Sequence, residues 1–263
     1  MSLTKEEIKQ LHSNLRVVRE CKILDKIPFK VISGSMGDEL EIAKVYDGAT
    51  GAFVEEYFNS EINRKIAQRC LVSFNNQDYV GFYDDEDLSK EEKKEKESEL
   101  KKKAVDKFST QKIGLIAEEY KQLSQDIEEY LNGFDKKKLD VSEVEEFIIT
   151  DQIERISTFK GEADLKIAYK VLNSKEYNEA IKEVKKLLDK KENISKMHKN
   201  VFQNIQMAKR VITGINNRTL TDEFAYYVGS EIVRFIINRA QDLQDEIFKT
   251  LKDPEKLGED LKN

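Results

Sequence analysis

The segment that decides the fold is residues 224–251, which read FAYYVGSEIVRFIINRAQDLQDEIFKTL. Apolar side chains recur there at spacings of three and four, which places them on one face of an α-helix. Thr221 precedes the segment as a candidate N-cap, and Pro254 follows it as a helix breaker. The pattern predicts a helix of about eight turns whose apolar stripe consists of Phe224, Val228, Ile232, Phe235, Ile236, Ala240, Leu243, Ile247 and Leu251.

A stripe of this length has two uses. It packs into a helical bundle, or it forms a surface for a partner protein. The bundle is the more common outcome, and the partner surface is the hypothesis with functional content. The candidate partner-binding residues are Phe224, Ile232, Phe235 and Ile236.

The rest of the C-terminal half also favours helices. We expect them over about 144–156, with a break near Asp151, and over 163–172, 174–188 and 194–213. This pattern predicts an all-α domain over 136–263.

The N-terminal half begins with Thr4-Lys5-Glu6-Glu7, a capping box that predicts a helix as far as about Glu20. The stretch from 22 to 33 is β-branched and aromatic and predicts one or two short strands, with Pro28 indicating an edge position. Helices then follow as far as about residue 131. We find no internal repeat with a fixed period.

The expected fold is therefore mainly α, with a small N-terminal β element followed by helices and a C-terminal helical bundle. The polar stretch 135–138 divides the chain into an α+β domain over 1–135 and the helical domain over 136–263. The first domain includes segment 84–103, which carries 16 charged residues and should form an exposed helix or connector.

Composition excludes several classes of protein. The chain has 263 residues, of which 37% are charged, and a net charge of −6, which argues against a surface that binds polyanions throughout. No apolar run approaches the roughly 18 residues that span a bilayer. We expect no membrane association, a cytoplasmic location and two free thiols, Cys21 and Cys70.

No pattern of catalytic or cofactor-binding residues is present. His12 and His198 have no Cys or carboxylate at metal-ligand spacing, and Gly34-Ser35-Met36-Gly37 lacks the Lys-Ser/Thr ending of a phosphate loop. Asp84-Asp85-Glu86-Asp87 lacks the alternating ligands of a calcium loop. We expect no enzyme activity, no catalytic residue, no cofactor and no metal.

Residues 182–210 carry nine Lys or Arg residues against three acids. A solvated helix surface explains this excess, but phosphate contacts also require such charges on one face. A helical protein associated with nucleic acid is therefore the alternative function. Its candidate anionic contacts are Lys185, Lys186, Lys190, Lys191, Lys199, Lys209 and Arg210.

A particular order of segments runs through residues 20–131. A short strand pair leads into Gly37-Asp38-Glu39-Leu40-Glu41-Ile42. A helix with Arg64, Ala67 and Arg69 then reaches Leu71-Val72-Ser73-Phe74-Asn75, which precedes a charged stretch. A helix with Leu115-Ile116-Ala117-Glu118-Glu119-Tyr120 follows. This order resembles the tail assembly chaperones and the baseplate assembly or hub proteins of tailed bacteriophages. The half over 136–263 has no counterpart in them.

The resemblance implies a protein that binds other tail or baseplate proteins without catalysis. It acts as a transient chaperone or as a retained virion component, in the host cytoplasm or in the virion. The sequence is compatible with an oligomer and does not determine the oligomeric state. The resemblance carries over no site residues.

Overall fold

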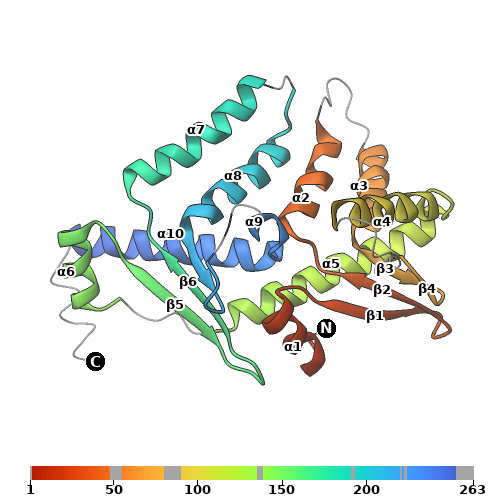
Figure 1. Ribbon diagram of the computed structural model, residues 1–263, viewed down its shortest axis with the longest axis horizontal. Helices are drawn as coiled ribbons and strands as arrows, with labels where there is room; N and C mark the ends of the chain where they lie inside the picture. The colour runs from red at the N-terminus through yellow and green to blue at the C-terminus, as the bar shows by residue number, and fades with distance from the viewer. Residues whose placement is uncertain are drawn as a thin grey trace.

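The computed structural model describes residues 2–47, 55–79, 90–134, 139–190, 193–219, 221 and 224–252. The chain forms two antiparallel sheets and a set of helices that cover them (Figure 1). Its first half contains α1 (Lys5–Asn14), β1 (Val18–Ile23), β2 (Ile27–Ile32), α2 (Met36–Ala43), the 3-10 helix η1 (Lys44–Tyr46), α3 (Glu55–Cys70), β3 (Leu71–Phe74), β4 (Gln77–Asp78), α4 (Lys90–Val105) and α5 (Thr110–Asn132).

The second half repeats this order, with a short helix in the place of α4. It contains α6 (Val141–Thr150), β5 (Glu154–Phe159), β6 (Leu165–Lys170), α7 (Ser174–Lys190), α8 (Lys196–Val211), β7 (Ile212–Ile215), α9 (Phe224–Tyr227) and α10 (Ser230–Lys252). The sheet orders are β1-β2-β3-β4 and β5-β6-β7. Both halves therefore run helix, hairpin, two helices, strand and long helix. We call residues 4–132 the first repeat and 140–252 the second.

The two repeats share their local chemistry at the first helix. Thr4 and Glu7 form a capping box on α1, and Asp140 and Glu143, 136 positions later, form one on α6. Arg19 on β1 donates to Glu7 at 2.6 Å, and its counterpart Arg155 on β5 donates to Glu143. The residues that end the two helices, Leu15 and Asp151, are both left-handed.

The repeats also share the irregularities of their sheets. The register between the second and third strands shifts at 30/31 in the first repeat and at 168/169 in the second, 138 positions later. The third strand then leads into two Asn residues with positive φ, Asn75-Asn76 and Asn216-Asn217, which are 141 positions apart. The offset grows from 136 to 138 to 141 positions along the chain, so the duplication has no fixed period.

One hydrophobic core runs through both repeats. It includes Leu11 and Val31 of the first repeat and Ile167 and Ile236 of the second. Helices α5 and α10 pack on each other in its centre, and α2 packs on α8. The repeats meet near residues 133–140, close to the expected boundary at 135/136, but they bury their apolar surface together.

The structure is mostly α with some β, and several expectations about its layout were wrong. The helix expected to reach about Glu20 ends at Asn14, and residues 18–23 form β1. Residues 71–74 and 77–78, expected among helices, form β3 and β4, and the helix expected over 224–251 is divided into α9 and α10.

Residues 154–159 and 165–170 are strands, so the C-terminal half has a sheet of its own. The helix expected to reach Thr213 ends at Val211 and leads into β7. Strand β2 lies between β1 and β3, so Pro28 is not on an edge strand; it lies one residue beyond the last β2–β3 pair.

Candidate functional site

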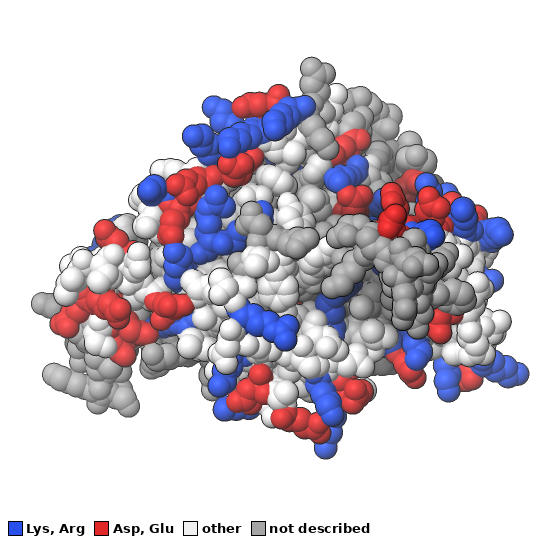
Figure 2. All heavy atoms as spheres, viewed as in Figure 1, with Lys and Arg blue, Asp and Glu red and all other residues white. Residues whose placement is uncertain are grey.

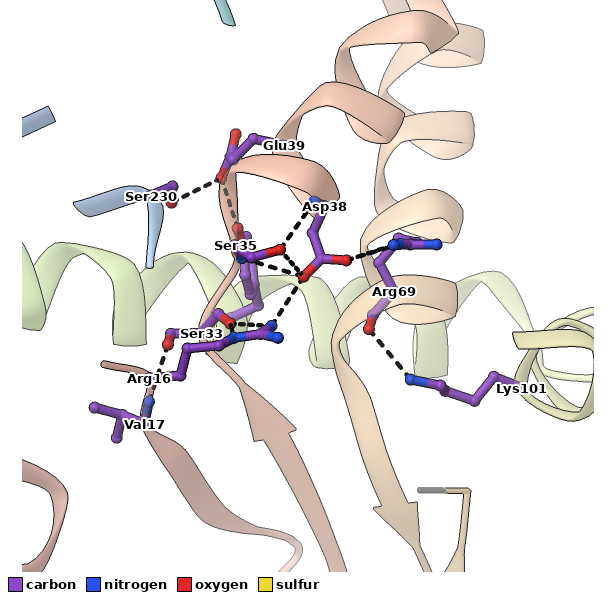
Figure 3. A network of polar contacts seen from close by, with 10 residues as sticks. Arg16, Val17, Ser33, Ser35, Asp38, Glu39, Arg69, Lys101 and Ser230 are labelled. Atoms are coloured by element: carbon purple, nitrogen blue, oxygen red, sulfur yellow. Dashed lines mark hydrogen bonds and ion pairs between the residues drawn. The ribbon is translucent and has the colours of Figure 1, made fainter. Parts of the chain in front are cut away.

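A polar network surrounds Asp38 at the start of α2 (Figure 3). Ser35 caps this helix, and its backbone N–H and hydroxyl both donate to Asp38 Oδ2, at 3.1 and 2.8 Å. Arg16 Nη2 donates to the same oxygen at 2.9 Å, and Arg69 donates from Nε to Oδ1 at 2.8 Å. The carboxylate therefore has a cation on each oxygen.

Burial raises the pKa of Asp38, but the charges of Arg16 and Arg69 and the hydrogen bonds from Ser35 outweigh it and hold that pKa below its ordinary value. Lys101 lies in the same cavity of about 520 Å³ and donates to the backbone oxygen of Arg69 at 3.3 Å. Burial lowers the pKa of Lys101. The three cations face Asp38, Glu41 and Glu97, so the formal charges of the cavity balance.

This network connects the two repeats. Glu39, next to Asp38, accepts a hydrogen bond from the Tyr120 hydroxyl at 2.7 Å, and Ser230 at the start of α10 lies against the same oxygen (Figure 3). The backbone N–H of Ser230 donates to the oxygen of Gly34 at 2.9 Å. Because the Asp38 carboxylate accepts bonds on both oxygens, it holds α2, α3 and the start of β1 together and is not a free base.

The two thiols are not activated. Burial, followed by the charge of Glu119, raises the pKa of Cys21 to about 12. Burial raises the pKa of Cys70 well above its ordinary value, and Cys70 lies in the core. Since the thiolate is the nucleophile, both side chains act as small apolar groups at neutral pH.

A second surface lies at the outer end of the second repeat. Ile148 and Ile149 at the end of α6 are 60% and 83% exposed, and Ile156 on β5 is 65% exposed. We call these three residues the α6 face. In Figure 1 α6 lies at the end of the molecule farthest from the first sheet. Large aliphatic side chains exposed at one end of a molecule are candidates for an interaction site.

A cavity of about 600 Å³ adjoins the α6 face. Ile156, Phe159 and Phe235 form its apolar side, and Arg155, Arg239 and Glu246 contribute charges. Arg239 lies over the Phe235 ring with its Cζ 4.8 Å from the centroid, and it donates to the backbone oxygen of Phe134 at 2.9 Å.

The candidate partner-binding residues are not at the α6 face. Ile232, Phe235 and Ile236 are buried in the core on α10, and Phe224 is half-buried on α9. Their stripe faces the sheet and α5, so this part of it is bundle core. The exposed large apolar side chains of α10 lie at its end, where Phe248 and Leu251 are 58% and 45% exposed.

The candidate anionic contacts are spread over α7 and α8. Lys185, Lys190 and Lys199 are exposed, and Lys186 is exposed but bonds Glu183 at 2.7 Å. Lys209 lies over the Tyr226 ring, and Arg210 donates to the backbone oxygen of Gln206. Figure 2 shows basic and acidic groups side by side over α7. Lys191, like Asp84-Asp85-Glu86-Asp87, lies outside the described residues.

Comparison with known proteins finds no match to a family model, a curated protein or a solved structure. In the described part of the chain, no helix is both long and apolar enough to cross a bilayer. The same residues contain no cluster of three His, Cys, Asp or Glu side chains arranged to hold a metal ion.

Proposed function

We propose that this protein binds another protein chain through the α6 face and acts in the assembly of a larger structure, without catalysis. The observation that carries the proposal is the exposure of Ile148, Ile149 and Ile156 at one end of the molecule. Burying a large aliphatic side chain stabilises a protein by roughly 1.5–3 kcal/mol relative to leaving it in water, and these side chains lack most of that stabilisation. A partner that covers them recovers part of that free energy.

The resemblance of residues 20–131 to tail and baseplate assembly proteins of bacteriophages supports a narrower version of this proposal. In that version the bound chain is a tail or baseplate protein. The expected products of a capture experiment are then tail or baseplate proteins, recovered equally with and without nuclease.

The test places a photo-crosslinking amino acid at Ile149 in the cell that makes the protein natively. Because the α6 face is the docking surface, we expect cross-linked adducts from this position. The Ile149→Lys variant, labelled instead at Ile148, should lose them, since a charge replaces the centre of the apolar patch.

The matched control is a cross-linker at Met197, which is 38% exposed on the first turn of α8 and lies outside the α6 face. It should give no equivalent adduct, and Met197→Lys should leave the adducts at Ile149 intact. Equal adducts at both positions, or adducts that survive Ile149→Lys, would contradict the proposal.

Nucleic-acid binding is the second candidate. Its support is the set of exposed lysines on α7 and α8, Lys185, Lys190 and Lys199. It requires retention on heparin that falls steeply with salt, because each phosphate contact releases counterions. The assembly proposal predicts weak retention for a chain with a net charge of −6.

A further inference from the structure

Helix α1 of the first repeat is the counterpart of α6, and a contact between the two repeats covers it. The turn between β5 and β6 of the second repeat lies against α1. The backbone oxygen of Ala163 in this turn lies 2.7 Å from His12 Nδ1, and Glu162 pairs with Lys9 at 3.0 Å. A Cβ added to Gly161 would lie 2.9 Å from the His12 ring. The turn thus seats closely on α1, and His12 is buried.

This contact is not reciprocated within the chain. Position 148 on α6 corresponds to His12 on α1, which is buried, yet Ile148 is exposed. Ile149 is also exposed, and its counterpart Ser13 is exposed on α1. The turn of the first repeat, between β1 and β2, is also exposed, and Leu24 at its tip is 83% exposed. Figure 1 places this turn and α6 at opposite ends of the molecule. The repeats are therefore joined head to tail, and each end carries one unused half of the same kind of contact.

The charges of the two free ends are complementary. The place of Lys9 on α1 is taken by Glu145 on α6, beside Glu146, and both acids are exposed. In the β1–β2 turn Lys26 is exposed beside the exposed Asp25, and Lys22 at the end of β1 is also exposed. Figure 2 shows acidic groups over α6 and both basic and acidic groups at the end where β1 and β2 turn. In the Lys9–Glu162 pair the helix is basic and the turn acidic, whereas at the free ends the helix is acidic and the lysines lie at the turn. The helix and the turn would still attract each other.

From this arrangement we infer that the occupant of the α6 face is the β1–β2 turn of a second copy of this chain. The inference rests on the proposed function, because it names the chain that docks there. A contact that is heterologous and does not close extends from copy to copy. The two repeats differ elsewhere, because the first carries α4 on α3 where the second has only a short helix. We therefore restrict the contact between copies to the turn and the α6 face. So small an interface binds weakly, and association depends on protein concentration.

Sedimentation velocity on the purified full chain and two variants tests the inference. Leu24→Glu removes the apolar tip and repels the acids of α6, while Ile149→Lys disrupts the α6 face and repels the lysines of the turn. We expect the mass of the wild type to rise with concentration beyond that of a dimer. Each variant alone should stay monomeric.

The mixture of the two variants is the decisive sample. The intact turn of Ile149→Lys should dock on the intact α6 face of Leu24→Glu, giving a 1:1 dimer that grows no further. Met197→Lys should associate like the wild type. If Leu24→Glu alone associates like the wild type, the α6 faces pair with something other than the turn, and the inference is overturned.

The two proposals fail separately. A wild type that stays monomeric at every concentration, together with adducts from Ile149 to a different protein, overturns the second copy and leaves the proposed function in place. Absence of any adduct at Ile149 in the cell overturns the proposed function.

Discussion

At the scale of single residues, two buried carboxylates have pKa values displaced in opposite directions. Asp38 is held ionised by Arg16 and Arg69 against the cost of burial. Glu231 at the start of α10 has a raised pKa because burial outweighs the charge of Arg234 and the hydrogen bond from Ser124. Burial therefore disfavours the charged form of both carboxylates, and the cations beside each group decide whether its net contribution to the stability of the fold at neutral pH is favourable or unfavourable.

Asp38→Asn should lower the free energy of unfolding at pH 7 by about 3 kcal/mol, because Arg16 and Arg69 lose their anion. An unfolded aspartate has a pKa of about 3.9, and that of Asp38 in the fold is lower. Its stabilising contribution is therefore present above about pH 3.9 and is lost as the pH falls through the folded pKa. Urea unfolding at pH 7 and pH 3 should show the difference from wild type shrinking in acid.

The control for this prediction is Glu231→Gln. The folded pKa of Glu231 is raised, so its contribution is fully present below the unfolded value of about 4.3 and is lost as the pH rises through the folded pKa. The variant should exceed the wild type in stability at pH 7 and match it in acid. A difference at Asp38 that does not change with pH would contradict the assignment of that carboxylate as ionised.

At the scale of elements, the two Asn turns are the same structure used twice. Asn76 and Asn217 are exposed and left-handed, with φ of 64° and 62°. A side chain in this region carries a steric cost that glycine avoids, and turns of this kind favour glycine at the second position. Asn76→Gly and Asn217→Gly should each stabilise the fold by about 0.5 kcal/mol.

Thermal unfolding of these two variants checks the equivalence of the repeats. Asn216→Gly is the contrast, because Asn216 Nδ2 donates to the backbone oxygen of His12 and its Oδ1 accepts from the Lys166 N–H. Losing both bonds should make that variant less stable than the wild type. Opposite signs at positions 76 and 217 would show that the turns are not equivalent.

The elements also show how far the sequence could be interpreted. The capping box at Thr4, the first hairpin and the amphipathic pattern of α5 and α10 followed from local patterns. Strand β5 did not, because its polarity is inverted: Arg155 faces inward to Glu143, and Ile156 faces outward. Hydrophobic periodicity would place Ile156 in the core and Arg155 in solvent, which is the reverse of what the structure shows. The signal in β6, where Leu165, Ile167 and Tyr169 alternate with exposed or half-buried residues, was present and was misread as a helix.

At the scale of the whole molecule, the duplication is the feature that the sequence analysis did not find. A search for a fixed period fails because the hairpin turn and the helix that follows it are longer in the second repeat. The signal that could have found it is the recurrence of Glu7 and Arg19 as Glu143 and Arg155, both twelve positions apart. The α6 face could not have been identified from sequence, since its exposure depends on which turn the chain places on which helix.

Because the two repeats share one core, they should unfold together. We expect that cutting the chain at an inserted protease site between 135 and 136 leaves the two halves bound 1:1, with one thermal transition. Each half made alone should lack a cooperative transition, because α5 and α10 each lose a buried face. Size-exclusion chromatography of the cut protein, with the uncut protein as control, is the measurement. Halves that separate and unfold independently would contradict a shared core.

The contact of Lys9 and His12 with residues 162 and 163 is small, and it is supported by a covalent tether. Few residues separate the end of α5 from the start of α6, and so short a link gives the second repeat an effective concentration in the millimolar range next to the first. Two free copies have no such tether. The same kind of contact between chains then depends on whatever raises their local density, so self-assembly would respond to recruitment: copies gathered on a common scaffold would join, and dispersed copies would not.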